Sequence, residues 1–242
     1  MKIDFSFIKA YCQVSPDDVE NLYLDWPATD LLQQEKTEQL LRQLQQLYKA
    51  HDLLLPASIV GMSIFGLIGT QGIITATYQK SVDLSLQHIR VQVGLFNNCT
   101  PFVALKIQTI SWKENNGTIS KEFKTAIENI SKVSGVKSSL IYNQFGARAS
   151  SLAEAFLQYE KKETVKASFN HWYNALKQDA TWWKNPFIHN PIYIDNPYSP
   201  SSKMMIRSSC CMFYRKKDGV KCYNCPTLSN EEREKMRRQL SI

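Results

Sequence analysis

The spacing of apolar and polar residues predicts a largely helical chain with a small sheet in its middle. In several segments the apolar residues recur every three or four positions, which is typical of a helix with one buried face. Helices are expected at residues 30–50, 121–133 and 137–159 and around residues 165–176. The sheet is expected between the first of these helices and the second.

Two segments in the middle of the chain have the period of strands. Apolar and polar residues alternate through residues 84–93, and a second apolar run follows at residues 101–110, after a turn at Asn97 and Asn98. This pattern predicts an antiparallel pair. The expected fold class is α+β, mostly helical with a small central antiparallel sheet and a C-terminal cysteine cluster module.

A long uncharged segment lies between Asp52 and Lys80. A membrane helix needs about 20 apolar residues, and residues 53–68 are strongly apolar. However, Pro56 and several glycines interrupt the segment, and it lacks an aromatic belt or a basic flank at its start. A buried core segment folded as strand, turn and helix is therefore favoured over a membrane span, while peripheral association with a membrane stays open.

Residues 182–200 follow neither the helical period nor the strand alternation over more than a few positions. They contain four prolines and five aromatic residues, a composition that predicts an ordered loop crossing the surface toward the end of the chain. Such a loop can form one wall of a substrate pocket, with His189 and Tyr193 as candidate residues. The alternative is that its aromatic side chains only fasten the loop to the core.

Positive charge is concentrated near the end of the chain. The chain carries a net charge of +7, and residues 201–242 contain ten Lys and Arg against four acidic residues. The first 200 residues are thus nearly neutral. We expect two domains, a helical α+β domain at residues 1–200 and a cysteine module at residues 201–242.

The basic segment contains four of the six cysteines in a C-C-x10-C-x2-C array, formed by Cys210, Cys211, Cys222 and Cys225. A cluster this tight indicates a metal site, because the C-x2-C spacing lets two thiolates bind one tetrahedral ion. Adjacent side chains of a strand point to opposite faces, so the backbone must turn at Cys210 and Cys211 for both sulfurs to reach one centre. A second turn is expected at residues 215–219, with Gly219 in a left-handed conformation.

Spacing and charge leave the metal open. Four thiolates around one zinc ion carry a charge of −2, and so do four thiolates around two ferric ions and two sulfides. A basic surrounding offsets either charge and, for a cluster, raises its reduction potential. A zinc ribbon is therefore the alternative to an iron–sulfur cluster. The isolated cysteines, Cys12 and Cys99, are expected not to be ligands, because free cysteines are usually small buried apolar residues.

Residues 207–226 resemble the C-terminal signature of the FhuF-type ferric siderophore reductases. The four cysteines match the Cys-Cys-x10-Cys-x2-Cys pattern of that family, an arginine precedes them at Arg207, and aromatic residues follow the vicinal pair. The resemblance implies a 2Fe–2S cluster bound by Cys210, Cys211, Cys222 and Cys225. It also implies one-electron reduction of siderophore-bound ferric iron, which releases ferrous iron. The rest of the chain matches only in length and helical texture.

The resemblance leaves a rival role open. Part of the aerobactin-type siderophore synthetases, which are not reductases, also resembles the FhuF-like region. The alternative function is therefore a non-redox interaction module that belongs to a siderophore biosynthesis or transport system. Zinc or a cluster would stabilise this module.

Other chemistries lack a signature. The glycines between residues 61 and 72 fit no nucleotide-binding loop, so electrons are expected from a separate donor such as a ferredoxin or a flavin reductase. The basic tail does not require nucleic acid, because Ser229 and Glu232 form a capping box at the start of a short helix. No catalytic residue beyond the cluster is expected.

Basic residues near the cysteines are candidates for tuning the cluster or for docking a partner by electrostatic steering. These candidates are Arg207, Arg215, Lys216, Lys217 and Lys221. Solvated surface charge is the alternative for the lysines. The start of the chain does not resemble a signal peptide, and unpaired thiols suit a reducing compartment. The expected location is therefore the cytoplasm. If the protein associates peripherally with a membrane, we expect it at the inner membrane.

Overall fold

The computed structural model describes residues 2–97, 99–113, 121–182, 184–199 and 201–240. Asn98, Trp183 and Pro200, which belong to the turn and the loop predicted above, lie outside this part. The described residues form seven α-helices and three small sheets, which confirms the α+β class with predominantly helical content. The division into two domains at residue 200 stays a prediction.

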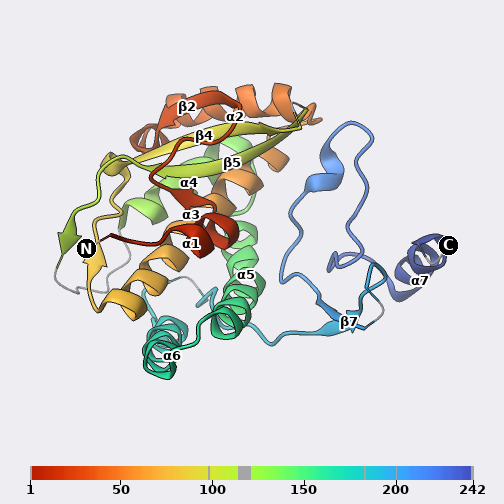
Figure 1. Ribbon diagram of the computed structural model, residues 1–242. Coiled ribbons are helices and arrows are strands. Elements are labelled where there is room, and N and C mark those ends of the chain that lie inside the picture. Colours follow the sequence, from red (N-terminus) through yellow and green to blue (C-terminus); the bar gives the residue numbers. More distant parts are fainter. Residues whose placement is uncertain (1, 98, 114–120, 183, 200, 241–242) are drawn as a thin grey trace.

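Helix α3 (Leu54–Tyr78) runs through the middle of the molecule (Figure 1). The other helices of the body contact it from different sides: α1 (Ser6–Cys12), α2 (Gln34–Tyr48), α4 (Lys121–Ser134), α5 (Ser138–Tyr159) and α6 (Glu163–Gln178). The predicted helices 30–50, 121–133, 137–159 and 165–176 correspond to α2, α4, α5 and α6, each within a few residues. Their apolar stripes pack into one core around α3.

The predicted strand and turn inside residues 53–79 are wrong, because α3 is one uninterrupted helix. Pro56 lies in its first turn, where a proline is tolerated, and the glycines provide close packing. A Cβ atom at Gly66 would clash with the carbonyl oxygen of Cys12, and one at Gly72 would meet the Trp172 ring. Among the described residues α3 is the one helix long and apolar enough to cross a membrane, and 83% of its most apolar window is buried in the protein.

The main sheet has the strand order β1-β5-β4-β2. Its centre is the predicted antiparallel pair, formed by β4 (Ile89–Phe96) and β5 (Thr100–Ile107). Sequence analysis missed β2 (Leu22–Pro27), which pairs with β4, and β1 (Val14–Ser15), which adds a parallel edge to β5. A strand of two residues carries no detectable period. Two further short strands, β3 (Ser81–Val82) and β6 (Trp112–Lys113), pair apart from this sheet.

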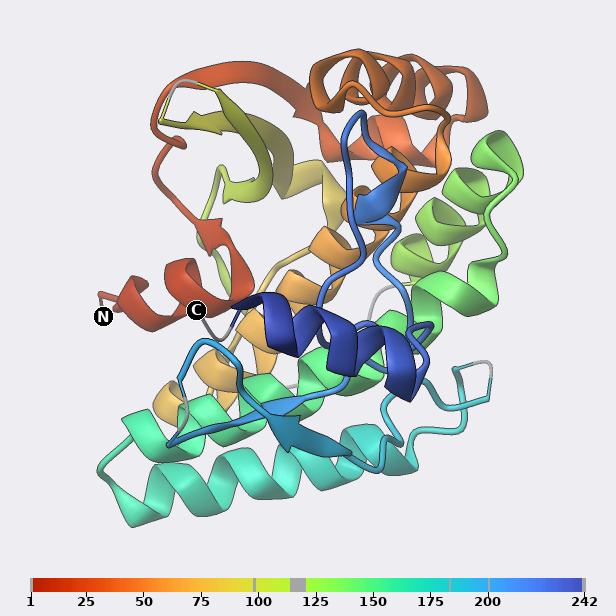
Figure 2. The ribbon, with the colours of Figure 1, turned by 90° about the vertical axis from the view of Figure 1, so that its right-hand side faces the viewer.

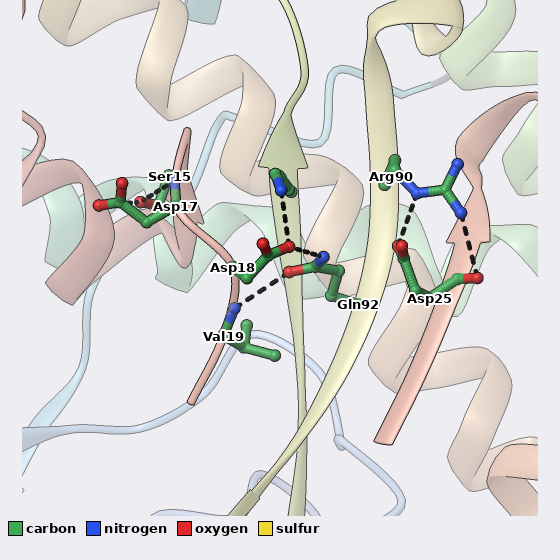
Figure 3. A network of polar contacts seen from close by, with 8 residues as sticks. Ser15, Asp17, Asp18, Val19, Asp25, Arg90 and Gln92 are labelled. Carbon is green, nitrogen blue, oxygen red and sulfur yellow. Dashed lines mark hydrogen bonds and ion pairs between the residues drawn. The ribbon is translucent and has the colours of Figure 1, made fainter. Parts of the chain in front are cut away.

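Polar contacts fasten the segment between β1 and β2 to the sheet (Figure 3). The buried side chain of Gln92 donates to Asp18 at 2.5 Å and accepts a hydrogen bond from the backbone N–H of Val19 at 3.1 Å. Asp18 also pairs with Lys106 at 2.7 Å. A cavity of about 730 Å³ opens beside this network. No residue of the cysteine array lines it.

The loop after α6 returns to the core through its aromatic residues. Trp182 and Phe187 are buried, and the ring of Phe187 stacks on Phe145 of α5 with the centroids 6.2 Å apart. Tyr193 and Tyr198 are exposed, so this packing agrees with aromatic side chains fastening the loop to the core for its first part only.

The cysteine module, residues 201–242, lies beside α5 at the right of Figure 1. It begins with β8 (Lys203–Met205), which pairs with β7 (Tyr193–Asp195), and it ends with α7 (Asn230–Leu240). Between these elements the chain extends in a long hairpin whose tip contains a short 3-10 turn, Phe213–Arg215. Figure 2 shows the hairpin reaching toward the end of α2.

Candidate metal centre

The hairpin brings the two pairs of cysteines together on two arms. We call residues 205–212 the first arm and residues 220–228 the second arm. The backbone N–H of Arg207 donates to the carbonyl oxygen of Asn224 at 3.0 Å, and the side chain of Asn224 donates to the carbonyl oxygen of Met205 at 3.1 Å. These two bonds connect the arms close to the cysteines.

The backbone turns directly after the vicinal pair, as predicted. Met212 has a left-handed conformation with φ 61°, and its N–H donates to the Sγ atom of Cys210 at 3.4 Å. At the hairpin tip the prediction for Gly219 is wrong, because Asp218 takes the left-handed position with φ 58°. Gly219 is required for a different reason, since a Cβ atom there would lie 2.8 Å from the carbonyl oxygen of Phe213.

The four thiols form two pairs around one small cavity. The Sγ atoms of Cys210 and Cys225 lie 3.8 Å apart, and Cys211 and Cys222, whose thiols shift each other's pKa, line the same cavity. A tetrahedral ion with metal–sulfur bonds of about 2.3 Å separates two of its sulfur ligands by about 3.8 Å. The spacing of Cys210 and Cys225 therefore fits two ligands of one ion. Among the described residues, no three His, Cys, Asp or Glu side chains form a group able to hold a single metal ion.

Local electrostatics favours thiolate at Cys211, whereas burial raises the pKa of Cys210 to about 11. The hydrogen bond from Cys222 lowers the pKa of Cys211, and the positive charge of Arg207 lowers it further. The same hydrogen bond raises the pKa of Cys222. Cysteine binds metal as thiolate, so one sulfur of this pair is prepared for ligation and the other must release its proton when metal binds.

Buried polar side chains of the body hold the first arm. Gln144 of α5 donates to the carbonyl oxygen of Cys210 at 2.6 Å, and Ser58 of α3 donates to that of Cys211 at 2.9 Å. Gln144 also donates to the hydroxyl of Ser58 at 2.8 Å, so the two helices and the vicinal pair share one network. Such a network fixes the two cysteine backbones because each buried carbonyl would lose a hydrogen bond on moving.

An arginine of α7 holds the second arm. Arg233 is buried, and its guanidinium donates to the carbonyl oxygens of Tyr223 at 3.1 Å and Cys225 at 3.0 Å. Helix α7 begins with the predicted capping box, in which the N–H of Ser229 donates to Glu232 and the N–H of Glu232 donates to the Ser229 hydroxyl. The final helix therefore supports the C-x2-C turn.

The family comparison identifies this arrangement. Residues 207–226, which contain all four cysteines, match the FhuF 2Fe-2S C-terminal domain. We call this segment the FhuF domain after the family model that it matches. Its resident cofactor is a 2Fe–2S cluster, which agrees with the resemblance seen in the sequence. No curated protein matches the chain.

The residues of the FhuF domain fit this cofactor. A 2Fe–2S cluster takes four cysteine thiolates, two on each iron, and the structure offers two pairs of thiols facing one cavity. Three of the four cysteines are buried, at 7% exposure for Cys210, 8% for Cys211 and 3% for Cys225, while Cys222 is half-buried. The ligand assignment to these four cysteines stays a prediction.

The basic residues predicted around the FhuF domain occupy different environments. Arg207 and Lys221 line the cavity of the cysteines. Arg215 instead forms an ion pair with Asp52, and Lys216 places its ammonium 4.5 Å from the centre of the Phe213 ring. The backbone N–H of Lys217 donates to the carbonyl oxygen of Lys49 at 2.8 Å. Lys216 and Lys217 both lie at the tip of the hairpin.

The other predicted site residues lie outside the cavity of the FhuF domain. His189 packs against Gly146 of α5; its Nε2 atom is buried without a hydrogen bond in the described part, and burial lowers its pKa. Tyr193 donates a hydrogen bond to Glu154, which raises the tyrosine's pKa to about 12. Cys12 is buried at the end of α1, and Cys99 is exposed between β4 and β5.

Sequence reasoning missed the residues that hold the FhuF domain in place. Ser58 and Gln144 are separated from the cysteines by many residues, and each lies in a helix whose apolar period gave no reason to select it. Arg148, which lines a cavity next to the two arms, had a detectable signal in the sequence. It is the one charged residue between Lys137 and Glu154, in a segment that otherwise reads as a buried helix.

Proposed function

We propose that the chain is a ferric siderophore reductase that transfers one electron to chelated ferric iron and releases ferrous iron. The observation that carries the proposal is the FhuF 2Fe–2S domain, whose four cysteines face one cavity at the surface of a helical body. The match relates the segment to siderophore-iron proteins with iron–sulfur clusters. The reaction itself is our inference.

The chemistry requires little from the side chains beyond binding and charge. Bound in the domain, the 2Fe–2S group supplies one electron at a time. The thiolates hold it, and the guanidinium of Arg207 and the ammonium of Lys221 offset its negative charge, which favours the reduced state. Hydroxamate, catecholate and citrate chelators bind the hard ferric ion better than the ferrous ion. Reduction therefore weakens the chelate without breaking a covalent bond of the chelator, and no general acid or base is needed.

The electron reaches the protein from a separate partner. We propose a reduced ferredoxin or a flavin reductase, since the sequence contains no nucleotide-binding loop that would hold a flavin or a nicotinamide. We also place the reaction in the cytoplasm, where the donor and the imported chelate meet, either free or at the inner face of the membrane.

Transient kinetics with the purified protein tests the proposal. Protein prepared without oxygen should be red-brown, contain iron and sulfide in equal amounts, and lose its visible absorption on reduction. After addition of a ferric siderophore, the absorption should return while a ferrous-specific dye reports one ferrous ion for each electron. Cys225→Ser, which lacks a buried ligand, should give neither signal.

Two results would contradict the proposal. A colourless protein that carries one zinc ion would support the non-redox interaction module instead. A red-brown protein whose reduced form transfers no electron to any ferric chelate would keep the cofactor and remove the reductase activity.

A further inference from the structure

A second cavity lies directly behind the cavity of the cysteines. It has a volume of about 220 Å³ and lies between α5 and the two arms. Arg207 lines both cavities, and Ser209 and Asn224, which line the second one, directly precede Cys210 and Cys225. Consecutive Cα atoms are about 3.8 Å apart, so this cavity is lined by residues that are the direct neighbours of two predicted cluster ligands.

The cavity contains two recessed positive charges. Arg148 projects from α5, and Arg207 comes from the first arm. The Nε atom of Arg207 is buried without a hydrogen bond in the described part of the chain. Burial lowers the pKa of Arg148, and the neighbouring charge of Arg207 lowers it further. No acidic residue is among the described residues that line the cavity.

Two guanidinium groups in one recess are unfavourable without a counter-ion. Recessed charges in proteins are normally paired, because burial removes their hydration and like charges repel. Among the described residues neither arginine forms an ion pair. Cys12, which interacts electrostatically with Arg148, is no substitute, since burial raises its pKa to about 12 and keeps it neutral.

The cluster can neutralise one of the two arginines but not both. Arg207 lines the cavity of the cysteines, so the negative charge of the bound cofactor faces it. Of these two cavities, Arg148 lines the second and not the cavity of the cysteines. Its charge is therefore available to an anion that enters from solvent.

The size of the cavity limits what enters. Pockets that enclose a whole ligand of drug size have about 300–1,000 Å³, and this cavity is smaller. It accepts an anionic group at the edge of a ligand, such as a carboxylate, for which a guanidinium offers two parallel donors. Gln144 lines the same cavity, and its side chain donates a hydrogen bond to the carbonyl oxygen of Cys210. One side chain therefore lies between the bound group and a predicted ligand of the cluster.

We propose that this cavity, which we call the arginine cavity, binds a carboxylate of an anionic ferric chelate, and that Arg148 selects such chelates over neutral ones. The inference rests on the proposed function and names its substrate class, the hydroxycarboxylate chelates. With the carboxylate on Arg148, the ferric ion lies at the mouth of the cavity, close to Cys210 and Cys225. One electron from the external donor converts the ferric ion to the ferrous ion, after which the iron–oxygen bonds dissociate.

Binding of redox-inert chelates to the cluster-loaded protein tests the inference separately from the reaction. Gallium(III) has the charge and ligand preference of ferric iron but accepts no electron, so calorimetry with gallium citrate measures recognition alone. Gallium bound by a neutral trihydroxamate and citrate without metal are the comparison ligands. The variants are Arg148→Gln, which removes the charge, and Arg148→Lys, which keeps it. Arg42→Gln, on the exposed face of α2, changes the net charge equally at a distance.

Arg148→Gln should weaken gallium citrate binding by about tenfold or more, the effect of losing one charged hydrogen bond, with unchanged visible absorption. Arg148→Lys should retain most of the affinity, and Arg42→Gln all of it. The neutral chelate should bind equally to all variants. Equal affinity of wild type and Arg148→Gln for gallium citrate would overturn the inference, and so would citrate alone binding as tightly as its gallium complex. Normal gallium binding without reduction of ferric citrate would instead remove the proposed function.

Discussion

Most residues of α3 are buried in the apolar core, whereas the described part of the cysteine module buries three of its cysteines, a tyrosine and an arginine. The body, residues 1–200, has a continuous core that includes six helices and the main sheet. None of the module's fully buried side chains belongs to that core. The body is therefore stabilised by apolar packing. The module is held by polar anchors and by Met212 and Phe213, whose side chains pack against the core of the body.

The two regions also differ in how their buried polar groups are used. In the body, the amide of Gln92 is hydrogen-bonded to Asp18 and Val19, in the segment between β1 and β2. In the module, Arg233 supports two carbonyl oxygens of the second arm, while Ser58 and Gln144 reach from the body to the first arm. The cysteines are thus positioned by the body but do not hold it together. Four experiments test this contrast, from the largest expected effect to the smallest.

Cys225→Ser should abolish the visible absorption and the reduction of ferric chelates, and it should leave the helical circular dichroism unchanged. The reason is that Cys225 is a predicted ligand, while the apolar core of the body contains no residue of the cysteine array. The double variant Cys12→Ala with Cys99→Ala is the matched control and should keep its full iron content. Global unfolding of Cys225→Ser would show that the body depends on the module.

Phe169→Ala tests the contrast by weakening the apolar core of the body instead of the cysteine module. Phe169 is fully buried and packs on Phe156 and Trp172, so its truncation should cost about 3–5 kcal/mol in the free energy of unfolding. Urea unfolding followed by circular dichroism measures this loss. In buffer without urea the variant should still bind its cluster, because Phe169 lies in α6 and does not line the cavity of the cysteines. Loss of the cluster in buffer would mean that the two regions unfold together.

The ion pair between Arg215 and Asp52 connects the hairpin tip to the body and should be weak. Arg215 lowers the pKa of Asp52, so the pair stabilises the folded state above the ordinary aspartate pKa and is lost as the pH falls through the lowered value. Asp52→Asn keeps the hydrogen bond to the N–H of Leu54 and removes the charge. It should cost about 0–1 kcal/mol at pH 7 and nothing in acid, since partly exposed pairs contribute little.

That comparison is best made by urea unfolding in a Cys225→Ser background, where acid releases no cluster. If Asp52→Asn changed the free energy of unfolding by the same amount at neutral pH and in strong acid, the result would contradict an electrostatic origin.

Charge reversal at Lys216 and Lys217 should have the smallest effect. If the hairpin tip docks an anionic chelate or an acidic donor, the double reversal should slow electron transfer at low salt and lose this effect near 0.15 M, where the screening length is about 8 Å. Stopped-flow kinetics across a salt series measures it, with cluster content unchanged. Rates equal to wild type at every salt concentration would identify these lysines as solvated surface charges.

Short-range sequence patterns were sufficient for many features of this protein. The helical period located α2, α4, α5 and α6, the alternation located β4 and β5, and the residues Ser229 and Glu232 located the start of α7. The cysteine array indicated a metal site, and its resemblance to a known family implied the 2Fe–2S cluster, because all four cysteines lie within sixteen residues of the chain. Each of these features depends on residues close together in the sequence, so the sequence alone determined them.

Tertiary structure decided the features that join distant residues. Residues 53–79 looked like strand, turn and helix, because glycine and proline disfavour a helix locally; close packing of Gly66 and Gly72 against their neighbours makes α3 continuous. The strands β1 and β2 form because β4 and β5 offer them edges. Gln144 reaches the carbonyl oxygen of Cys210, and Arg148 lines a cavity with residues of both arms, only because α5 packs against the two arms. Contacts between residues far apart in the sequence leave no period or spacing to read, so these positions became visible only in the folded chain.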